Sequence, residues 1–115
     1  MAGVGVSGQS LSGRSSPRAQ VTMPCRVSWP GVEVVALTRD LSPEGLAVSL
    51  SDDAALEGKE KVHIYLHERI ALQAVPVHSR REPGRLVAGF KVHRIKQGAR
   101  EWNQLIDGLQ RYRRL

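Results

Sequence analysis

Two groups of residues in this chain carry side chains suited to binding an anionic ligand. Arg14 and Arg18 form the pattern R-x-x-x-R, and a guanidinium group donates paired hydrogen bonds to phosphate oxygens or to the acceptor edge of guanine. Just over twenty residues downstream, Asp40, Ser42 and Gly45 form the pattern D-x-S-x-x-G. A carboxylate accepts hydrogen bonds, whereas a hydroxyl both donates and accepts them. The chain therefore offers anion donors in one segment and a polar acceptor set in another.

The second pattern lies in a polar stretch, residues 38–45, that runs into an alternating apolar segment. Pro43 fixes its own φ, and the side chains of Asp40 and Ser42 can bond to nearby backbone amides. We expect Gly45 to take a positive φ that returns the chain into the next strand. The stretch is thus predicted to be a rigid, solvent-facing loop between the second and third strands.

The elements that position these residues follow from hydrophobic periodicity. Six runs with apolar residues at alternate positions predict strands, and these runs lie at residues 19–29, 32–39, 46–50, 62–67, 70–78 and 86–92. The period then changes to that of a helix, whose apolar face carries Trp102, Leu105, Ile106, Leu109 and Tyr112. We predict an all-β domain, a six-stranded antiparallel β-barrel, with a C-terminal helix at residues 96–114 that packs against it.

Composition limits the partners and the compartment. The chain has 115 residues and a formal net charge of +6, which predicts one domain and an anionic partner such as a nucleotide, nucleic acid, membrane surface or acidic protein. Cys25 is the only cysteine, so an intrachain disulfide is excluded and a buried thiol in a reducing cytoplasm is expected. Residues 1–13 are rich in Gly and Ser and predict a flexible leader.

No set of residues predicts catalysis or metal binding. His63 and His67 lie on one predicted strand face without a third ligand nearby in sequence. Ser42 has neither a histidine base close to it nor a G-x-S-x-G context. Asp52 and Asp53 are adjacent on a connection rather than converging on a substrate. We therefore expect no enzyme activity, no cofactor and no metal.

The arginine pair followed by the D-x-S-x-x-G pattern, ahead of a strand-rich middle and a C-terminal helix, resembles the PilZ domain family. This family is the bacterial receptor module for the second messenger cyclic di-GMP. The resemblance covers nearly everything from Arg14 onward. It implies a domain at residues 14–115, with an arginine segment at 14–18, a barrel at 19–93 and the helix after it.

The resemblance also implies roles for the five motif residues. Arg14 and Arg18 bind phosphate or guanine and close over the ligand, so the arginine segment becomes ordered when cyclic di-GMP binds. Asp40 accepts hydrogen bonds from the guanine N1–H and N2–H2 edge, Ser42 donates to the ligand, and Gly45 lets it approach the backbone. Whether one ligand or a stacked pair binds stays open.

The setting and one alternative also stay open. PilZ domains occur alone as adaptors or within larger proteins, including cellulose synthase catalytic subunits, so a partner protein or parent protein is expected on the cytoplasmic side. The alternative function is a small basic β-barrel that binds single-stranded nucleic acid, which would need exposed aromatic side chains for base stacking. A PilZ-like module that no longer binds nucleotide is a third possibility.

Overall fold

The computed structural model describes residues 18–51, 53–56, 58 and 60–113, with the side chains of residues 112 and 113 left out. The elements are β1 (Ala19–Gln20), β2 (Pro24–Trp29), β3 (Val32–Ser42), β4 (Gly45–Ser51), β5 (Val62–Leu66), β6 (Ile70–Glu82), β7 (Arg85–Gln97) and α1 (Ala99–Arg113).

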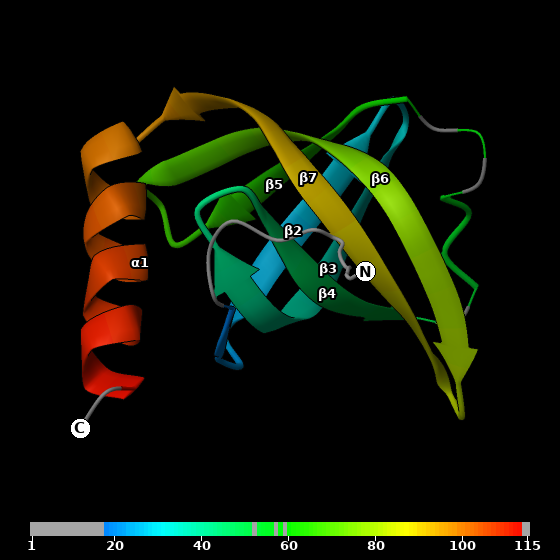
Figure 1. Cartoon of the computed structure of the whole chain (residues 1–115). Coiled ribbons are helices and arrows are strands. Elements are labelled where there is room, and N and C mark those ends of the chain that lie inside the picture. The colour runs from blue at the N-terminus through cyan, green and yellow to red at the C-terminus, as the bar shows by residue number, and fades with distance from the viewer. Residues whose placement is uncertain (1–17, 52, 57, 59, 114–115) are drawn as a thin grey trace, which may run out of the picture.

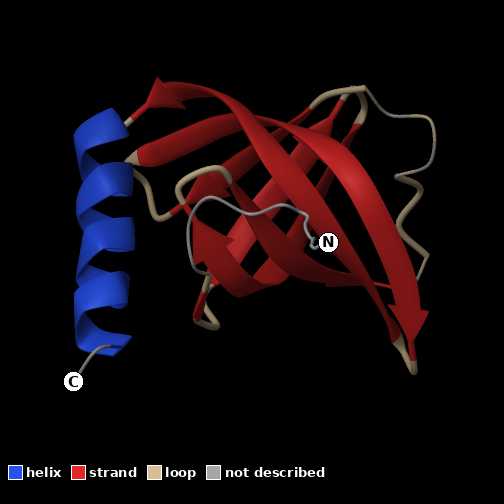
Figure 2. Ribbon diagram, viewed as in Figure 1, coloured by secondary structure: helices blue, strands red, loops and turns tan. Residues whose placement is uncertain are grey.

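The strands form a closed antiparallel barrel. Neighbouring strands follow the order β3-β2-β5-β6-β7-β4, and the pairing of β3 with β4 joins the two ends of this sheet. The two-residue strand β1 adds to β3 outside the ring of six. Figures 1 and 2 show the barrel with α1 lying across one end and the tip of the β6–β7 hairpin projecting from the other. The predicted six-stranded barrel with a C-terminal helix is confirmed.

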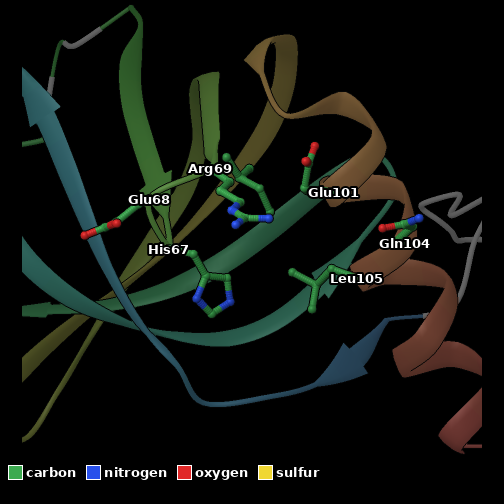
Figure 3. A pocket seen from close by; sticks show the side chains of 7 residues that line it. His67, Glu68, Arg69, Glu101, Gln104 and Leu105 are labelled. Carbon is green, nitrogen blue, oxygen red and sulfur yellow. The ribbon is translucent and has the colours of Figure 1, made fainter.

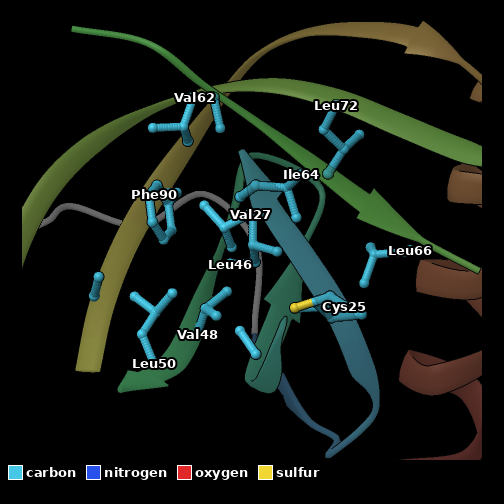
Figure 4. Close-up of a cluster of buried hydrophobic side chains, with 14 of the residues drawn as sticks. Cys25, Val27, Leu46, Val48, Leu50, Val62, Ile64, Leu66, Leu72 and Phe90 are labelled. Carbon is cyan, nitrogen blue, oxygen red and sulfur yellow. The ribbon is translucent and has the colours of Figure 1, made fainter. Parts of the chain in front are cut away.

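The core contains side chains of the strands, several of which Figure 4 shows, and side chains of the helix. Each of the strands β2 to β7 contributes side chains to the buried cluster, and Trp102 and Ile106 of α1 belong to the same cluster. Phe90 and Trp102, each 1% exposed, are the largest side chains that are fully buried. Burying an aromatic side chain of this size contributes about 2–3 kcal/mol, so the helix is held to the barrel by its predicted apolar face.

Cys25 faces this core as the sequence predicted. Its side chain is 4% exposed, and burial raises the pKa of the thiol to about 11. The neutral thiol is therefore the form that the folded protein favours. The stability that depends on keeping this buried thiol neutral is fully present below the thiol's ordinary pKa. It is lost as the pH rises through the raised pKa of the folded protein.

Several predicted boundaries are wrong. The run at residues 19–29 is two strands, because the regular pairing with β3 is interrupted at residues 21–23, between β1 and β2. The hairpin of β6 and β7 is longer than predicted, since the basic stretch at residues 80–85 continues the pairing and only Pro83 and Gly84 form its turn.

The helix begins later than its predicted start at residue 96. β7 continues to Gln97, and Gly98 takes a φ of 81° before α1 starts at Ala99. A Cβ at Gly98 would collide with the backbone carbonyl of Arg69, so glycine is required there on two counts. Residue 114, the predicted end, lies outside the described residues. In the part of the chain that the structure describes, no helix has the length and hydropathy needed to cross a membrane.

A β-bulge in β3 sets which side chains face outward. The register with β4 shifts between Thr38 and Asp40, which leaves Arg39 as an extra residue. Thr38 and Leu41 are both 0% exposed, although regular alternation would turn Asp40 inward and Leu41 outward. The extra residue reverses the alternation. It thereby fills the core with Leu41 and leaves Asp40 on the outer face.

Thr38 also fixes the chain between β1 and β2. Its Oγ1 accepts a hydrogen bond from the Met23 amide at 3.0 Å and donates one to the Val21 carbonyl at 2.6 Å. Backbone bonds add to this, because the Thr38 amide donates to the Met23 carbonyl and the Val21 amide donates to the Arg39 carbonyl. One buried hydroxyl thus pins residues 21–23 against β3.

We predict that Thr38→Val lowers the free energy of unfolding by about 1–3 kcal/mol. Valine keeps the shape but leaves the Met23 amide and the Val21 carbonyl without their side-chain partner. Urea unfolding measures the change, with Thr22→Val as the matched control because Thr22 is exposed. A loss for Thr38→Val no greater than that for the control contradicts this role.

Candidate functional site

Arg18 and Asp40 form an ion pair on the outer surface of the barrel. Arg18 directly precedes β1, and Gln20 of β1 pairs with Asp40 of β3. The Arg18 Nη1 atom donates a hydrogen bond to Asp40 Oδ1, and the two side chains are 26% and 25% exposed. This partial burial reduces screening by salt. The structure therefore brings together one residue from each of the two motifs.

Ser42 supports the neighbouring turn from inside. Its side chain is 2% exposed, and its Oγ donates to the Gly45 carbonyl and accepts from the Gly45 amide, each at 3.2 Å. The expectation of a solvent-facing loop over residues 38–45 is wrong. Pairing of β3 with β4 continues to Ser42 and Gly45, so only Pro43 and Glu44 form the turn.

Gly45 serves packing rather than backbone conformation. The described glycines with positive φ are Gly31, Gly58, Gly84 and Gly98, so the positive φ expected at Gly45 is wrong. A Cβ at Gly45 would instead overlap the backbone carbonyl oxygen of a residue on β7, Phe90. The absence of a side chain lets β4 and β7 approach closely and holds the turn beside Asp40.

Small residues form the outer surface next to Asp40. Asp40 pairs with Ala47 of β4, Ala47 with Gly89 of β7, and Gly89 with His78 of β6. Residues paired in this way share a face of the sheet. The His78 ring covers Gly89, because its nearest atoms lie 2.5 Å from where a Cβ of Gly89 would be. Next to Asp40 the row therefore carries only the methyl group of Ala47, and the His78 ring covers its far end.

A second ionic group lies across the same face. Arg39 Nη1 is 3.3 Å from Glu82 Oε1, and Arg80 Nη2 is 2.8 Å from Glu82 Oε2. Hydrogen bonds from Arg80 and then from Arg39 lower the pKa of the Glu82 carboxyl. The carboxylate therefore stays charged to lower pH than an isolated glutamate, and the network weakens only as the pH falls through that lowered pKa.

The sequence patterns did not single out Thr38 or Arg39 as residues of the site. Arg39 stood out only as the residue before the D-x-S-x-x-G pattern, and the signal for the bulge was the change of apolar phase between Ala36 and Leu41. The predicted ligand arginine Arg14 lies outside the described residues. Its contribution to the site stays a prediction.

A pocket with a different lining lies elsewhere. It has a volume of about 640 Å³ and lies between the turn after β5 and helix α1, where His67, Glu101 and Leu105 line it (Figure 3). Neither Arg18 nor Asp40 lines this pocket. Concavity alone therefore does not locate the residues that the motifs single out.

The histidines do not gather around a metal. His63 is half-buried with its ring 6.5 Å from that of Tyr65, and His67 is exposed in a turn with a φ of 54°. Among the residues that the structure describes, no group of three or more His, Cys, Asp or Glu side chains is arranged to hold a metal ion.

A comparison with models of protein families tests the family resemblance that these motifs indicated. The model of the PilZ domain matches residues 12–109. This chain belongs to the PilZ domain family. PilZ is a regulatory, generally non-catalytic family that binds cyclic di-GMP, and the match spans both motifs. The predicted family is confirmed.

A solved PilZ-type structure supports the same fold. It is titled "Structure of Bacillus subtilis Inhibitor of motility (MotI/DgrA)" and aligns with a TM-score of 0.72 at 20% sequence identity. The alignment covers 87% of this chain and 51% of that one, so the chain spans about half the length of that protein. At this identity the likeness concerns the fold. No curated protein sequence matches the chain.

We predict that Gly45→Ala destabilises the domain by about 1–3 kcal/mol, because the new methyl group forces β7 away from β4. Gly108→Ala is the matched control. Nothing lies within 4 Å of a Cβ at Gly108 in α1, and alanine in a helix stabilises by about 0.5–1 kcal/mol relative to glycine. Thermal unfolding that moves both variants in the same direction contradicts the packing role of Gly45.

Proposed function

We propose that this PilZ domain is a cyclic di-GMP receptor whose ligand lies on the outer face of the barrel beside Asp40. The observation that carries the proposal is the Arg18–Asp40 ion pair. It joins the arginine motif to the turn motif in one half-buried, solvent-accessible place. A guanidinium and a carboxylate at that place match a ligand with two phosphodiester charges and two guanine bases.

The ion pair leaves Asp40 able to bind guanine. A carboxylate has about four lone-pair sites, and the bond from Arg18 uses one of them on Oδ1. The guanine N1–H and N2–H2 groups donate to the remaining sites, while the planar guanidinium of Arg18 stacks on the base or binds a phosphate oxygen. Adenine presents a different donor and acceptor pattern on that edge, so cyclic di-AMP fits poorly.

Ser42 and Gly45 act behind this surface in the proposal. Their mutual hydrogen bonds and the close approach to Phe90 hold the turn. Because Ser42 is 2% exposed, its main contribution is to the shape of the turn, and any bond to the ligand requires its hydroxyl to leave Gly45.

Fewer residues become ordered in this proposal than the whole arginine segment at residues 14–18. Ala19 is 3% exposed and pairs with Leu41, and Arg18 contacts Asp40, so both are docked without ligand. Ordering on ligand binding therefore concerns residues 14–17. Arg14 supplies the second guanidinium, and the ligand supplies the contacts that offset about 1–2 kcal/mol per residue of backbone entropy.

The signal passes to a protein partner or a parent protein in this proposal. Helix α1 contacts both β1 and β6, so an element joined to Arg18 touches the helix directly. The similar structure is titled an inhibitor of motility, and control of motility or of exopolysaccharide synthesis, as in cellulose synthase, are the candidate outputs. A ligand that is an intracellular messenger and a buried free thiol at Cys25 support a cytoplasmic site of action.

The alternative of single-stranded nucleic acid binding has little support from the barrel surface. Trp29, Phe90 and Trp102 are each at most 5% exposed. Tyr65 is half-buried, and the Arg26 guanidinium carbon lies 4.9 Å from its ring centroid. Few aromatic faces in the described part of the chain are therefore available for stacking bases.

We predict that the domain binds cyclic di-GMP and that Arg18→Ala weakens binding by about tenfold or more. Loss of a charge-assisted hydrogen bond costs about 1.5–3 kcal/mol. Isothermal titration calorimetry measures affinity and stoichiometry, with cyclic di-AMP, GTP and a short single-stranded oligonucleotide as competitors. Arg26→Ala is the matched control, since Arg26 also forms an ion pair, with Glu33, away from the site.

Three outcomes contradict this account. Equal affinity for cyclic di-GMP and cyclic di-AMP shows that Asp40 does not select guanine. Equal losses in Arg18→Ala and Arg26→Ala show a general charge effect. Tighter binding of the oligonucleotide than of cyclic di-GMP favours the nucleic-acid function.

We further predict that the backbone amides of Arg14, Ser15 and Ser16 gain hydrogen-exchange protection on adding cyclic di-GMP, while amides in the barrel strands change little. The new contacts with phosphate and guanine provide that protection. Unchanged exchange at these amides with saturating ligand refutes the ordering of the arginine segment, even where calorimetry shows binding.

A further inference from the structure

Two consecutive residues of β3 have their side chains on the outside of the barrel. The neighbours on either side, Thr38 and Leu41, are both 0% exposed, whereas Arg39 and Asp40 are partly exposed. Neighbouring side chains in a regular strand point to opposite faces, and the bulge at Arg39 removes that constraint. The side chain of Arg39 therefore leaves the backbone directly beside Asp40, the carboxylate proposed to bind guanine.

The side chain of Arg39 extends over the outer face of β4 and β7. It begins on β3 and reaches Glu82 on β6, and the sheet order places β7 and β4 between these strands. Val87 of β7 lies on the outer face, opposite its partner Ser49 of β4, yet its side chain is only 4% exposed. The contact with Glu82 thus carries the charged end of Arg39 toward the row of Ser49 and Val87, which lies next to the row of Ala47 and Gly89 beside Asp40.

Glu82 has a second cationic partner that is independent of Arg39. Arg80 lies two residues before Glu82 on β6 and bonds to the other carboxylate oxygen at the shorter distance, 2.8 Å against 3.3 Å. Glu82 therefore remains paired when Arg39 departs. Breaking the longer of the two contacts, between Arg39 and Glu82, releases the arginine that lies beside Asp40.

We propose that Arg39 is a third ligand-binding arginine, which leaves Glu82 to bind a phosphodiester of the dinucleotide, and that Glu82 competes with the ligand for it. This inference rests on the proposed cyclic di-GMP function. A glutamate carboxylate and a phosphodiester each present two anionic oxygens to a guanidinium. In the ligand-free protein, Glu82 occupies the arginine that the phosphate takes in the complex.

This role differs measurably from that of a surface ion pair that only joins β3 to β6. For a purely structural pair, removing either partner gives the same small effect on stability and none on binding. For a competing pair, removing Arg39 and removing Glu82 change ligand affinity in opposite directions. The sign of the Glu82 effect is therefore the decisive observation.

Calorimetric titration with cyclic di-GMP of Arg39→Gln, Glu82→Gln and the double variant tests the proposal. We expect Arg39→Gln to weaken binding by about tenfold, as loss of a charge-assisted bond requires. We expect Glu82→Gln to tighten binding by about two- to fivefold, on the order of the strength of a partly exposed ion pair. The double variant should bind like Arg39→Gln alone, because Glu82 acts only through Arg39.

The ion pair between Arg26 and Glu33 supplies matched controls, since it is of the same type and lies toward the other end of β3. Arg26→Gln and Glu33→Gln make the same charge changes without touching the site. An affinity for Glu82→Gln no higher than for Glu33→Gln, or unchanged binding by Arg39→Gln, overturns the proposal while leaving receptor function intact. Absence of cyclic di-GMP binding in the unmodified domain overturns both.

Discussion

The bulge at Arg39 is the constraint on which the candidate site depends. A strand that lines a barrel alternates between core and solvent, and one extra residue reverses this alternation for the residues that follow. Leu41 can therefore fill the core while Asp40 stays on the outer face. The barrel keeps its apolar interior and presents two adjacent ionic side chains on its surface.

The position of Arg18 depends on packing more than on its own ion pair. A partly exposed pair such as Arg18–Asp40 contributes only about 0–1 kcal/mol. Burial of Ala19 holds β1 itself, and the hydrogen bonds of Thr38 hold the chain that follows it. Because the charged pair is not what anchors the segment, its atoms can exchange partners with a ligand without releasing the strand.

The sequence predicted what depends on local pattern and missed what depends on register. Alternation predicted the barrel, and a period of 3.6 predicted that the face of Trp102 and Ile106 would be buried. The bulge was missed because the core position after Ala36 is occupied by a polar residue, Thr38. The alternating apolar pattern of β3 therefore ends before the bulge is reached. The roles of Gly45 and Arg39 follow from contacts with β7 and β6, which are distant in sequence and which no local pattern encodes.

The most direct test of the account is where the ligand lies. Ala47 has a methyl group on the outer face between Asp40 and Gly89, whereas Leu105 lines the pocket beside α1. We expect intermolecular NOEs from the protons of bound cyclic di-GMP to the Ala47 methyl group, and none to the methyl groups of Leu105. NOEs to Leu105 without any to Ala47 would place the ligand in the pocket at the helix and contradict a site organised by the bulge.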